Sequence, residues 1–259
     1  MLNFKNVNII FLFIGLPFFV ILKIDGSLSG WLVFLFLMIW FLFTIIGSFH
    51  IRWNFFLKGY HKNDQVKEKI IALTFDDGPN EEFTSKVLSL LREYNAKANF
   101  FCIGENVKKN PEVLKEIVKN GHLIGNHSYS HKNSFGFLGT KKVIEELKST
   151  NKIIEEKTNL KVNFFRPPFG VTNPNIAKAV QKLNLYTFGW SIRSLDTIAK
   201  DSDKVCQKII SKMNNGDILL MHDSSELSVQ VLEKLLQYFD QNHIKTITLD
   251  KLFNLKAYG

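Results

Sequence analysis

The stretch IIALTFDDGP, residues 70–79, joins an apolar run typical of a buried strand to two adjacent carboxylates and a turn. Gly78 and Pro79 end the strand directly after Asp76 and Asp77. In a straight strand the two carboxylates would point to opposite faces, but the turn allows both to face one cavity. One carboxylate could then bind a cation while the other takes up a proton. An acidic turn without chemistry explains this motif alone equally well.

Six further short apolar runs follow, and longer amphipathic stretches separate them. The runs span residues 98–103, 122–126, 162–165, 185–190, 217–222 and 245–249. Strands that alternate with helices indicate a parallel sheet, so the sequence predicts an α/β fold, a distorted (β/α)7 barrel. Pro111, Asn173-Pro174 and Gly216 mark helix ends, and the longest helix is expected over residues 140–157.

The first 60 residues are much more apolar than the rest, and they hold half of the 24 Phe residues. Two runs, about 7–22 and 31–49, are predicted to be transmembrane helices. The first run contains Gly15 and Pro17 and could instead belong to a secretory signal. We favour a transmembrane hairpin because no convincing cleavage site follows. The sequence therefore predicts a membrane anchor over residues 1–60 and a catalytic domain over residues 61–259.

The net charge of +9 indicates a diffuse basic excess. Such an excess suits an acidic membrane surface or an anionic glycan, although solvated helix faces explain it more simply. No run of Lys and Arg is interleaved with aromatic residues, so no nucleic acid partner is expected. Cys102 and Cys206 form no C-x-x-C pair, and both are expected to be buried structural thiols.

Two histidines follow the run at 122–126, in the segment GNHSYSH, residues 125–131. If this segment forms a helical turn, the rings of His127 and His131 face the same way and can bind one ion. With Asp77 they supply two nitrogen donors and one carboxylate, and this set leaves coordination positions free for water and substrate. An isolated H-x-x-x-H is more often two surface histidines, but its position after a strand favours a metal site.

Two more polar residues stand at strand ends. Arg166 follows the run at 162–165, and His222 ends the run at 217–222. A structural ion pair would explain Arg166 alone, and a histidine at the edge of the core would explain His222 alone. In parallel α/β barrels, however, the carboxyl ends of the strands meet at one mouth. Acidic, basic and imidazole groups at four strand ends therefore predict an active site.

These motifs resemble those of the NodB-like polysaccharide deacetylases, carbohydrate esterase family 4, over roughly residues 69–250. The matching stretches, in the order of that family, are TFDDG (74–78), HSYSH (127–131), RPPFG (166–170), GWSIRSLD (189–196) and LLMH (219–222). The resemblance implies a distorted barrel, which agrees with the strand pattern. It also implies an enzyme that removes N-acetyl or similar small N-acyl groups from sugars.

The family resemblance assigns a role to each motif. It implies a divalent metal ion, with zinc expected, held by Asp77, His127 and His131. Asp76 would act as the general base, with Arg166 holding it in place. The backbone N–H of Phe169 would contribute to an oxyanion hole, and His222 would act as the general acid.

The fourth motif departs from the family pattern. Arg193 stands at its first acidic position, and Thr197 follows its second, Asp196. Asp196 can still raise the basicity of His222. We expect Trp190 and Arg193 at the rim of the site, where the guanidinium could contact an anionic part of the substrate. A substituted ion-pair partner is an equally good explanation for Arg193.

Other functions use the same residues. The fold could serve a membrane-anchored glycan-binding protein with reduced catalysis, or a deformylase of a lipid-linked amino sugar. Two histidines and a carboxylate also bind iron in non-haem oxygenases, but Asp76, Arg166 and His222 favour hydrolysis. The expected substrate is a cell-envelope glycan such as peptidoglycan, or a lipid-linked sugar. The short link after the second span favours substrates close to the membrane.

We expect an integral protein of the bacterial inner membrane. A hairpin places both of its flanks on one side, and the flanking Lys5, Arg52, Lys58 and Lys62 would make that side cytoplasmic. The family resemblance points to an outward-facing domain instead, because such enzymes mostly act on envelope glycans. We prefer the outward orientation.

Overall fold

The computed structural model describes residues 3–27 and 29–259, and its central feature is one parallel sheet. The longer strands are β2 (Ile70–Asp76), β3 (Ala98–Cys102), β4 (Leu123–Asn126) and β8 (Ile218–His222). The shorter ones are β1 (Gly59–Tyr60), β5 (Phe164–Phe165), β6 (Tyr186–Phe188), β7 (Ile192–Arg193) and β9 (Lys245–Thr246). All seven predicted strands are present, and β1 and β7 are additional.

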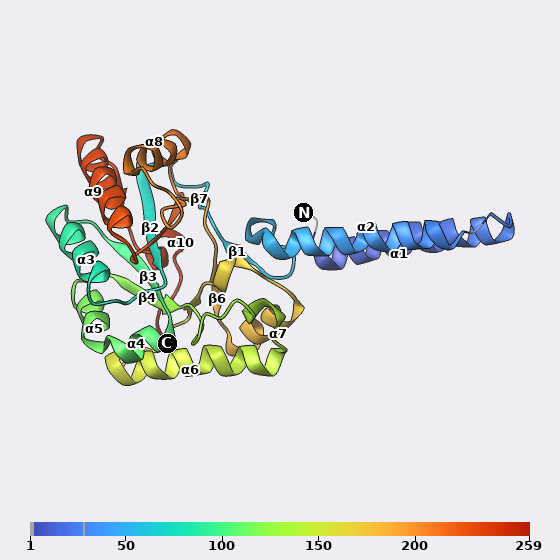
Figure 1. Cartoon of the computed structure of the whole chain (residues 1–259), viewed down its shortest axis with the longest axis horizontal. Coiled ribbons are helices and arrows are strands. Elements are labelled where there is room, and N and C mark those ends of the chain that lie inside the picture. Colours follow the sequence, from blue (N-terminus) through green and yellow to red (C-terminus); the bar gives the residue numbers. More distant parts are fainter. Residues whose placement is uncertain (1–2, 28) are drawn as a thin grey trace.

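The sheet curls into an incompletely closed barrel. Its strand order is β1-β6-β5-β4-β3-β2-β8-β7, and β9 pairs with the start of β2. Strands β6 and β7 therefore lie towards opposite ends of the sheet, although only residues 189–191 separate them in the chain. Such a link spans at most about 14 Å, so the two ends of the sheet must lie close together. The predicted distorted barrel is confirmed (Figure 1).

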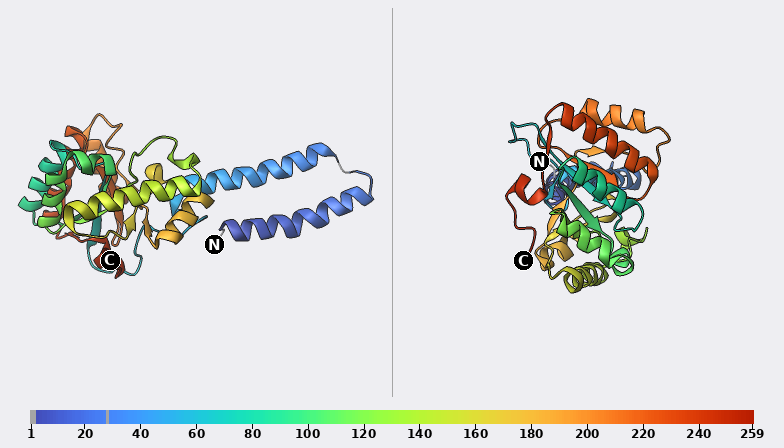
Figure 2. Two further views of the ribbon diagram at one scale, coloured as in Figure 1. Left: turned by 90° about the horizontal axis from the view of Figure 1, so that it is seen from below. Right: turned by 90° about the vertical axis from the view of Figure 1, so that its left-hand side faces the viewer.

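Helices cover the outside of the barrel, as Figures 1 and 2 show. They are α3 (Phe83–Glu93), α4 (Gly104–Lys109), α5 (Pro111–Lys119), α6 (Thr140–Thr158), α7 (Pro174–Leu183), α8 (Ser202–Lys212), α9 (Glu226–Gln241) and α10 (Leu249–Phe253). Pro111 begins α5 as predicted, and the Asn173 side chain caps α7 by accepting from the Ile176 N–H at 2.9 Å. The expected helix over 140–157 is α6.

Two apolar helices precede the barrel and pack side by side as a hairpin (Figures 1 and 2). They are α1 (Phe4–Ile24) and α2 (Gly30–Phe49), and both are long and apolar enough to cross a membrane. Their 21 and 20 residues correspond to lengths of about 30 Å each. Little of either helix is buried: the buried residues are Val7 and Gly15 of α1 and Gly47 of α2. Trp40 Nε1 links the helices by donating to Asn8 Oδ1 at 2.8 Å.

Two hydrogen bonds hold the base of the hairpin against the barrel. The Thr172 N–H, in the loop after β5, donates to the Ser48 carbonyl near the end of α2 at 2.9 Å. Arg52 Nε donates to the Trp190 carbonyl, in the link between β6 and β7, at 3.0 Å. Both loops follow the carboxyl ends of strands. The hairpin therefore joins the barrel at the edge where chemistry is expected.

The turn after β2 rests on a buried carboxyl group. A Cβ added at Gly78 would lie 2.2 Å from Asp223 Oδ2, so glycine is required for this close approach. Asp223 Oδ2 accepts from the Thr84 hydroxyl, and Asn80 Nδ2 donates to the Asp223 carbonyl at 2.7 Å. Within the described chain, Asp223 Oδ1 has no hydrogen-bond partner. Burial raises the pKa of Asp223 to about 7.

Asp223 should make the stability of the protein fall as the pH rises. Its carboxyl group is protonated in the folded chain up to about pH 7, whereas in the unfolded chain it ionises near 3.8. The stabilisation is complete below the lower value and lost by the upper one. Relative to Asp223→Asn, the free energy of unfolding of the wild-type chain should fall by roughly 4 kcal/mol across this window. Denaturation at pH 4 to 8 measures it. Parallel curves for the two proteins would contradict the prediction, and Asp64→Asn supplies an exposed control.

Candidate active site

The strand register brings the predicted residues together at the carboxyl edge of the sheet. Asp76, the last residue of β2, pairs with His222, the last residue of β8. Asn126 at the end of β4 pairs with Phe165 at the end of β5, so His127 and Arg166 also lie next to each other. Parallel pairing alone therefore places two carboxylates, a guanidinium and two imidazoles around one mouth.

Asp77, His127 and His131 form a compact set of possible metal ligands. Asp77 Oδ1 lies 3.5 Å from His127 Nε2 and 3.4 Å from His131 Nε2. One ligand atom from each residue lies within 4.8 Å of the other two. Ligands about 2.0–2.1 Å from a tetrahedral ion lie roughly 3.4 Å from one another. The donor set and its spacing thus fit a single divalent cation.

Hydrogen bonding and burial prepare the imidazoles for this role. His127 Nδ1 lies 2.8 Å from the Arg166 carbonyl, and this contact leaves Nε2 directed towards Asp77. The pKa values of His127 and His131 are both lowered, because the effect of burial is larger than the opposing effect of the nearby carboxylates. The neutral ring, which is the form that binds metals, is therefore favoured.

The segment between the two histidines is not the helical turn that the sequence suggested. Ser128 and His131 have positive φ values of 65° and 47°. A carboxylate from α6 holds this turn, because Glu146 Oε2 accepts from the Tyr129 and Ser130 N–H groups at 3.0 and 2.9 Å. The two rings still face each other, with centroids 4.8 Å apart. The two imidazoles therefore lie together as expected, but an irregular turn with positive φ angles brings them together instead of a helical turn.

Arg166 is fully buried and fixes Asp76. Its Nη1 donates to Asp76 Oδ1 and to Thr74 Oγ1, each at 2.8 Å, and its Nη2 donates to the Gly189 carbonyl at 2.8 Å. The guanidinium also lies 4.2 Å above the Phe101 ring. The other carboxylate oxygen, Asp76 Oδ2, faces His127 Nε2 at 3.7 Å. One oxygen is thus held by the guanidinium, and the other is directed at the ligand set.

His222 and Asp196 form a second polar pair on the opposite side of Asp76. Asp196 Oδ1 lies 2.9 Å from His222 Nδ1, and Oδ2 accepts from the His222 N–H at 2.8 Å. Burial alone would lower the pKa of His222, but the hydrogen bond to Asp196 and the surrounding carboxylates raise it above its ordinary value. The Ser194 hydroxyl completes the pair by donating to Asp196 at 2.7 Å. This arrangement stabilises a protonated imidazole.

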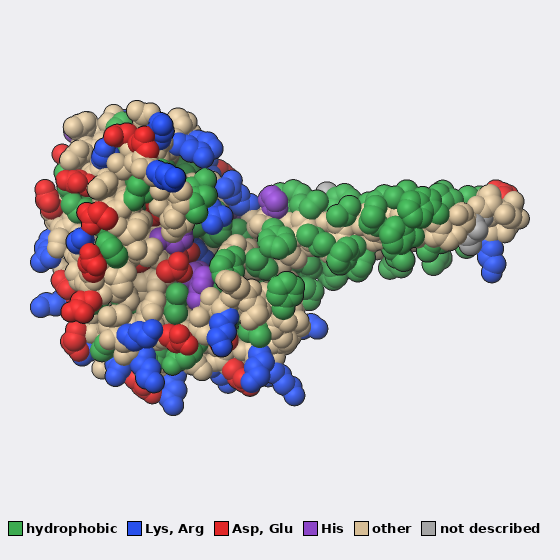
Figure 3. All heavy atoms as spheres, in the orientation of Figure 1, with side chains coloured by type: hydrophobic (Ala, Val, Ile, Leu, Met, Phe, Trp, Pro, Cys, Tyr) green, Lys and Arg blue, Asp and Glu red, His purple; other side chains and the backbone are tan. Residues whose placement is uncertain are grey.

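The remaining predicted residues lie around the mouth. Phe169 has a positive φ of 59°, and its half-exposed ring lies 4.8 Å from the ring of His131. Trp190 packs against Gly170, where an added Cβ would lie 2.5 Å from the indole. Arg193 is exposed, with its guanidinium 6.0 Å from the Trp190 ring. In Figure 3 histidine side chains are visible on this face, close to the base of the apolar hairpin.

Four residues that support the site were not predicted. Thr74 binds Arg166, and Glu146 holds the histidine turn. Asn106 Nδ2 donates to the Asp77 carbonyl at 2.7 Å, and Asp223 supports the turn at Gly78. Asp223 adjoins His222 in a motif and could have been singled out. The others act over long sequence separations and carry no local signal.

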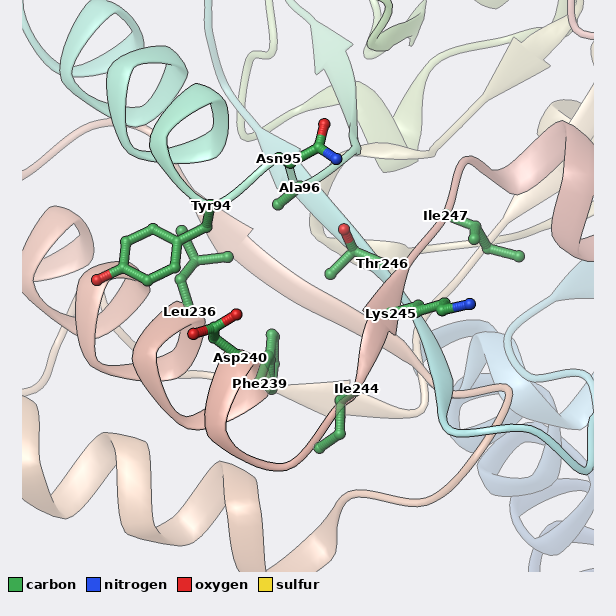
Figure 4. Close-up of a pocket in the computed structure, with 10 residues that line it drawn as sticks. All are labelled: Tyr94, Asn95, Ala96, Leu236, Phe239, Asp240, Ile244, Lys245, Thr246 and Ile247. Atoms are coloured by element: carbon green, nitrogen blue, oxygen red, sulfur yellow. The ribbon is translucent and has the colours of Figure 1, made fainter.

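A separate pocket lies at the other end of the barrel. Figure 4 shows its lining, which comes from the ends of α3 and α9 and from strand β9. Because β9 pairs with Ile70 and Ile71 at the start of β2, this pocket lies at the amino edge of the sheet. Asp240 and Lys245 are its charged residues, and none of the predicted site residues lines it.

Comparisons with known proteins agree with this geometry. The polysaccharide deacetylase family matches residues 63–188. A peptidoglycan-N-acetylglucosamine deacetylase from Bacillus cereus is 32% identical over 187 residues, which cover 71% of this chain and 68% of that protein. The peptidoglycan-N-acetylglucosamine deacetylase PgdA from Listeria monocytogenes is 31% identical over 73% of this chain, but the match covers 40% of PgdA.

A solved structure shares both the fold and the sequence pattern. It is a peptidoglycan N-acetylglucosamine deacetylase in complex with an N-oxidanyl-benzamide compound. The TM-score is 0.72 at 30% identity, and the match covers 77% of this chain and 94% of that one. The chain therefore belongs to the polysaccharide deacetylase family, which confirms the predicted family and the predicted class of enzyme, a hydrolase that deacetylates N-acetyl sugars.

Proposed function

We propose that this protein is a metal-dependent hydrolase that removes the N-acetyl, or a similar small N-acyl, group from an amino sugar of the cell envelope. The observation that carries the proposal is the placement of Asp76 between the possible metal ligands and His222, with Asp76 and His222 each held by its own buried partner. The names of the relatives, peptidoglycan-N-acetylglucosamine deacetylases, support the choice of an N-acetyl sugar.

Asp77, His127 and His131 would hold the cation, and the proposed ion is zinc, which catalytic sites bind through two imidazoles and one carboxylate. When bound, a divalent cation polarises the acyl carbonyl and lowers the pKa of a bound water molecule. The two imidazoles, kept neutral by burial, are ready to act as ligands without first losing a proton.

Asp76 would act as the general base. Arg166 holds Oδ1, so Oδ2 is the oxygen that remains available to accept a proton from the attacking water. The buried guanidinium fixes the direction of the carboxylate. Arg166 also donates to Thr74 and to the Gly189 carbonyl. These two hydrogen bonds hold the guanidinium in place, so it keeps Asp76 in one orientation.

The other two groups would act on the tetrahedral intermediate. The Phe169 N–H, in the loop beside His131, would donate to the oxygen on which negative charge develops. His222 would give its proton to the nitrogen of the departing amine. Its raised pKa and the buried Asp196 favour the protonated ring that this step requires.

Metal binding and catalysis should separate in two variants. Asp76→Asn should keep its metal but lose about 10²–10⁴-fold in turnover, because the base is gone and the ligands remain. His127→Ala should lose both metal and turnover. Metal content by mass spectrometry, together with release of acetate and free amine from N-acetylated sugars, checks both results. An Asp76→Asn protein with near wild-type turnover would rule out this base, and Asp64→Asn controls for loss of a carboxylate.

Arg193 should bind an anionic part of the substrate. The side chain is exposed at the rim beside Trp190. Arg193→Ala should raise KM several-fold for an anionic sugar substrate and leave kcat nearly unchanged, because it removes binding rather than transition-state stabilisation. The KM for a neutral N-acetylglucosamine oligomer should not change. Lys200→Ala, another exposed cation, is the control, and an unchanged KM on the anionic substrate would eliminate the contact.

We also propose that residues 1–60 form a membrane anchor and that residues 61–259 form a catalytic domain facing outward. The length and composition of α1 and α2 support this anchor. Both ends of the hairpin lie next to the segment that enters the barrel, because the Phe4 N–H donates at 2.8 Å to the carbonyl of Phe55, in the link between α2 and β1. The cations Lys5, Arg52, Lys58 and Lys62 therefore lie on the domain side of the anchor, and they oppose the proposed orientation.

Reporter fusions test the orientation. An alkaline phosphatase fused to the C-terminus should be active, because it folds after export, whereas a green fluorescent protein in its place should stay dark. The reverse pattern would place the catalytic domain in the cytoplasm.

A further inference from the structure

An apolar groove of about 620 Å³ lies beside the active site, where the hairpin meets the barrel. The apolar side chains that line it are Phe41, Ile45 and Phe49 of α2 and Phe137, Phe169 and Val171 of the barrel loops. Hydrogen bonds hold its walls in place. The Thr172 N–H donates to the Ser48 carbonyl at 2.9 Å, and Asn173 Nδ2 donates to the Gly136 carbonyl at 2.6 Å.

The groove connects the hairpin to the possible metal ligands. Phe169 lines it and also contacts the ring of His131, with centroids 4.8 Å apart. At the other end, Phe41 and Phe49 lie on α2 two helical turns apart, a distance of about 12 Å. One end of the groove thus lies at the site of chemistry, and the other runs along the apolar surface of the hairpin (Figure 3).

The groove holds two exposed phenylalanine side chains of the barrel. Among the residues described after Trp53, the exposed large apolar side chains are Phe137, Phe169 and Ile198, at 91%, 49% and 75%. Two of these three line the groove. Together with the apolar side chains of α2 they form one contiguous apolar surface, and such a surface is typical of a site that meets an apolar partner.

Cationic groups stand next to the groove. Trp190 packs on Gly170, directly after Phe169. Arg52 Nε donates to the Trp190 carbonyl at 3.0 Å, and the Arg193 guanidinium lies 6.0 Å from the Trp190 ring. Guanidinium groups bind phosphate well. The apolar groove, the cations Arg52 and Arg193 and the candidate active site therefore lie next to one another.

On the basis of the proposed deacetylase activity and membrane anchor, we propose that the substrate is a lipid-linked amino sugar, a sugar joined through phosphate to a long hydrocarbon chain. The chain lies in the groove along α2, and the N-acyl group reaches the site of Asp77, His127 and His131. A hydrocarbon chain leaving the bilayer would bury Phe137 together with the apolar side chains of α2 along the whole length of the groove.

Kinetics on full-length protein in nanodiscs test the proposal. The substrates are N-acetylglucosaminyl phosphate esters of a long isoprenoid and of a short alkyl chain. Phe137→Ser should raise KM for the long-chain substrate about tenfold, because apolar contact is lost, and should leave the short-chain substrate unaffected. Ile198→Ser, the matched exposed control outside the groove, should affect neither. Equal effects of the two variants, or equal wild-type kcat/KM for the two chains, would overturn the proposal.

A binding measurement separates this proposal from the proposed function. A photoreactive isoprenoid phosphate should label the segments 133–137 and 169–173 in the wild type and equally in Asp76→Asn, since labelling needs no turnover. Labelling without deacetylation of any sugar would reject the proposed function and support the groove as a lipid site. Deacetylation of soluble glycans without such labelling would reject the groove. Equal labelling by a photoreactive phospholipid would show general lipid contact and would also reject it.

Discussion

The buried ion pair between Arg166 and Asp76 is the interaction on which the rest of the site depends. A guanidinium with no exposure to solvent is costly unless charged and polar partners surround it. Asp76 and Thr74 on β2 and the carbonyl of Gly189 supply those partners. Because Gly189 lies in the link from β6 to β7, the same side chain joins the middle of the sheet to the segment that draws its two ends together. Closure of the barrel and orientation of the carboxylate therefore share one cause.

Around this pair, each group for which we propose a catalytic role has one atom held by the fold and another left unbound. His127 is fixed through Nδ1 and presents Nε2, while Asp76 is fixed through Oδ1 and presents Oδ2. His222 is fixed through Nδ1 by Asp196. The buried partners of these groups cannot be reached by water, so the protein sets the direction of each lone pair or proton before any substrate arrives.

The sequence predicted the parts of the fold that carry periodic patterns and the parts of the site that carry strand-end motifs. The longer strands and α6 were found because their apolar residues recur at strand or helix spacing. Strands β1 and β7 have two residues each and offer no period to detect. The turn around His127 and His131 depends on Glu146, fifteen positions further along the chain than His131, so local spacing suggested a helix instead. The groove is formed by α2 and two distant loops, and no single segment of sequence could reveal it.

The two hydrogen bonds that tie Ser48 to Thr172 and Arg52 to Trp190 have a consequence for encounter kinetics. A catalytic domain on a flexible linker would move freely about its anchor and meet substrates at many heights above the membrane. Here two hydrogen bonds hold the barrel against the hairpin, so in the proposed membrane-anchored protein the active site would stay at one height above the lipid surface. With the anchor in place, the collision frequency would follow the number of targets per unit area of membrane rather than their bulk concentration.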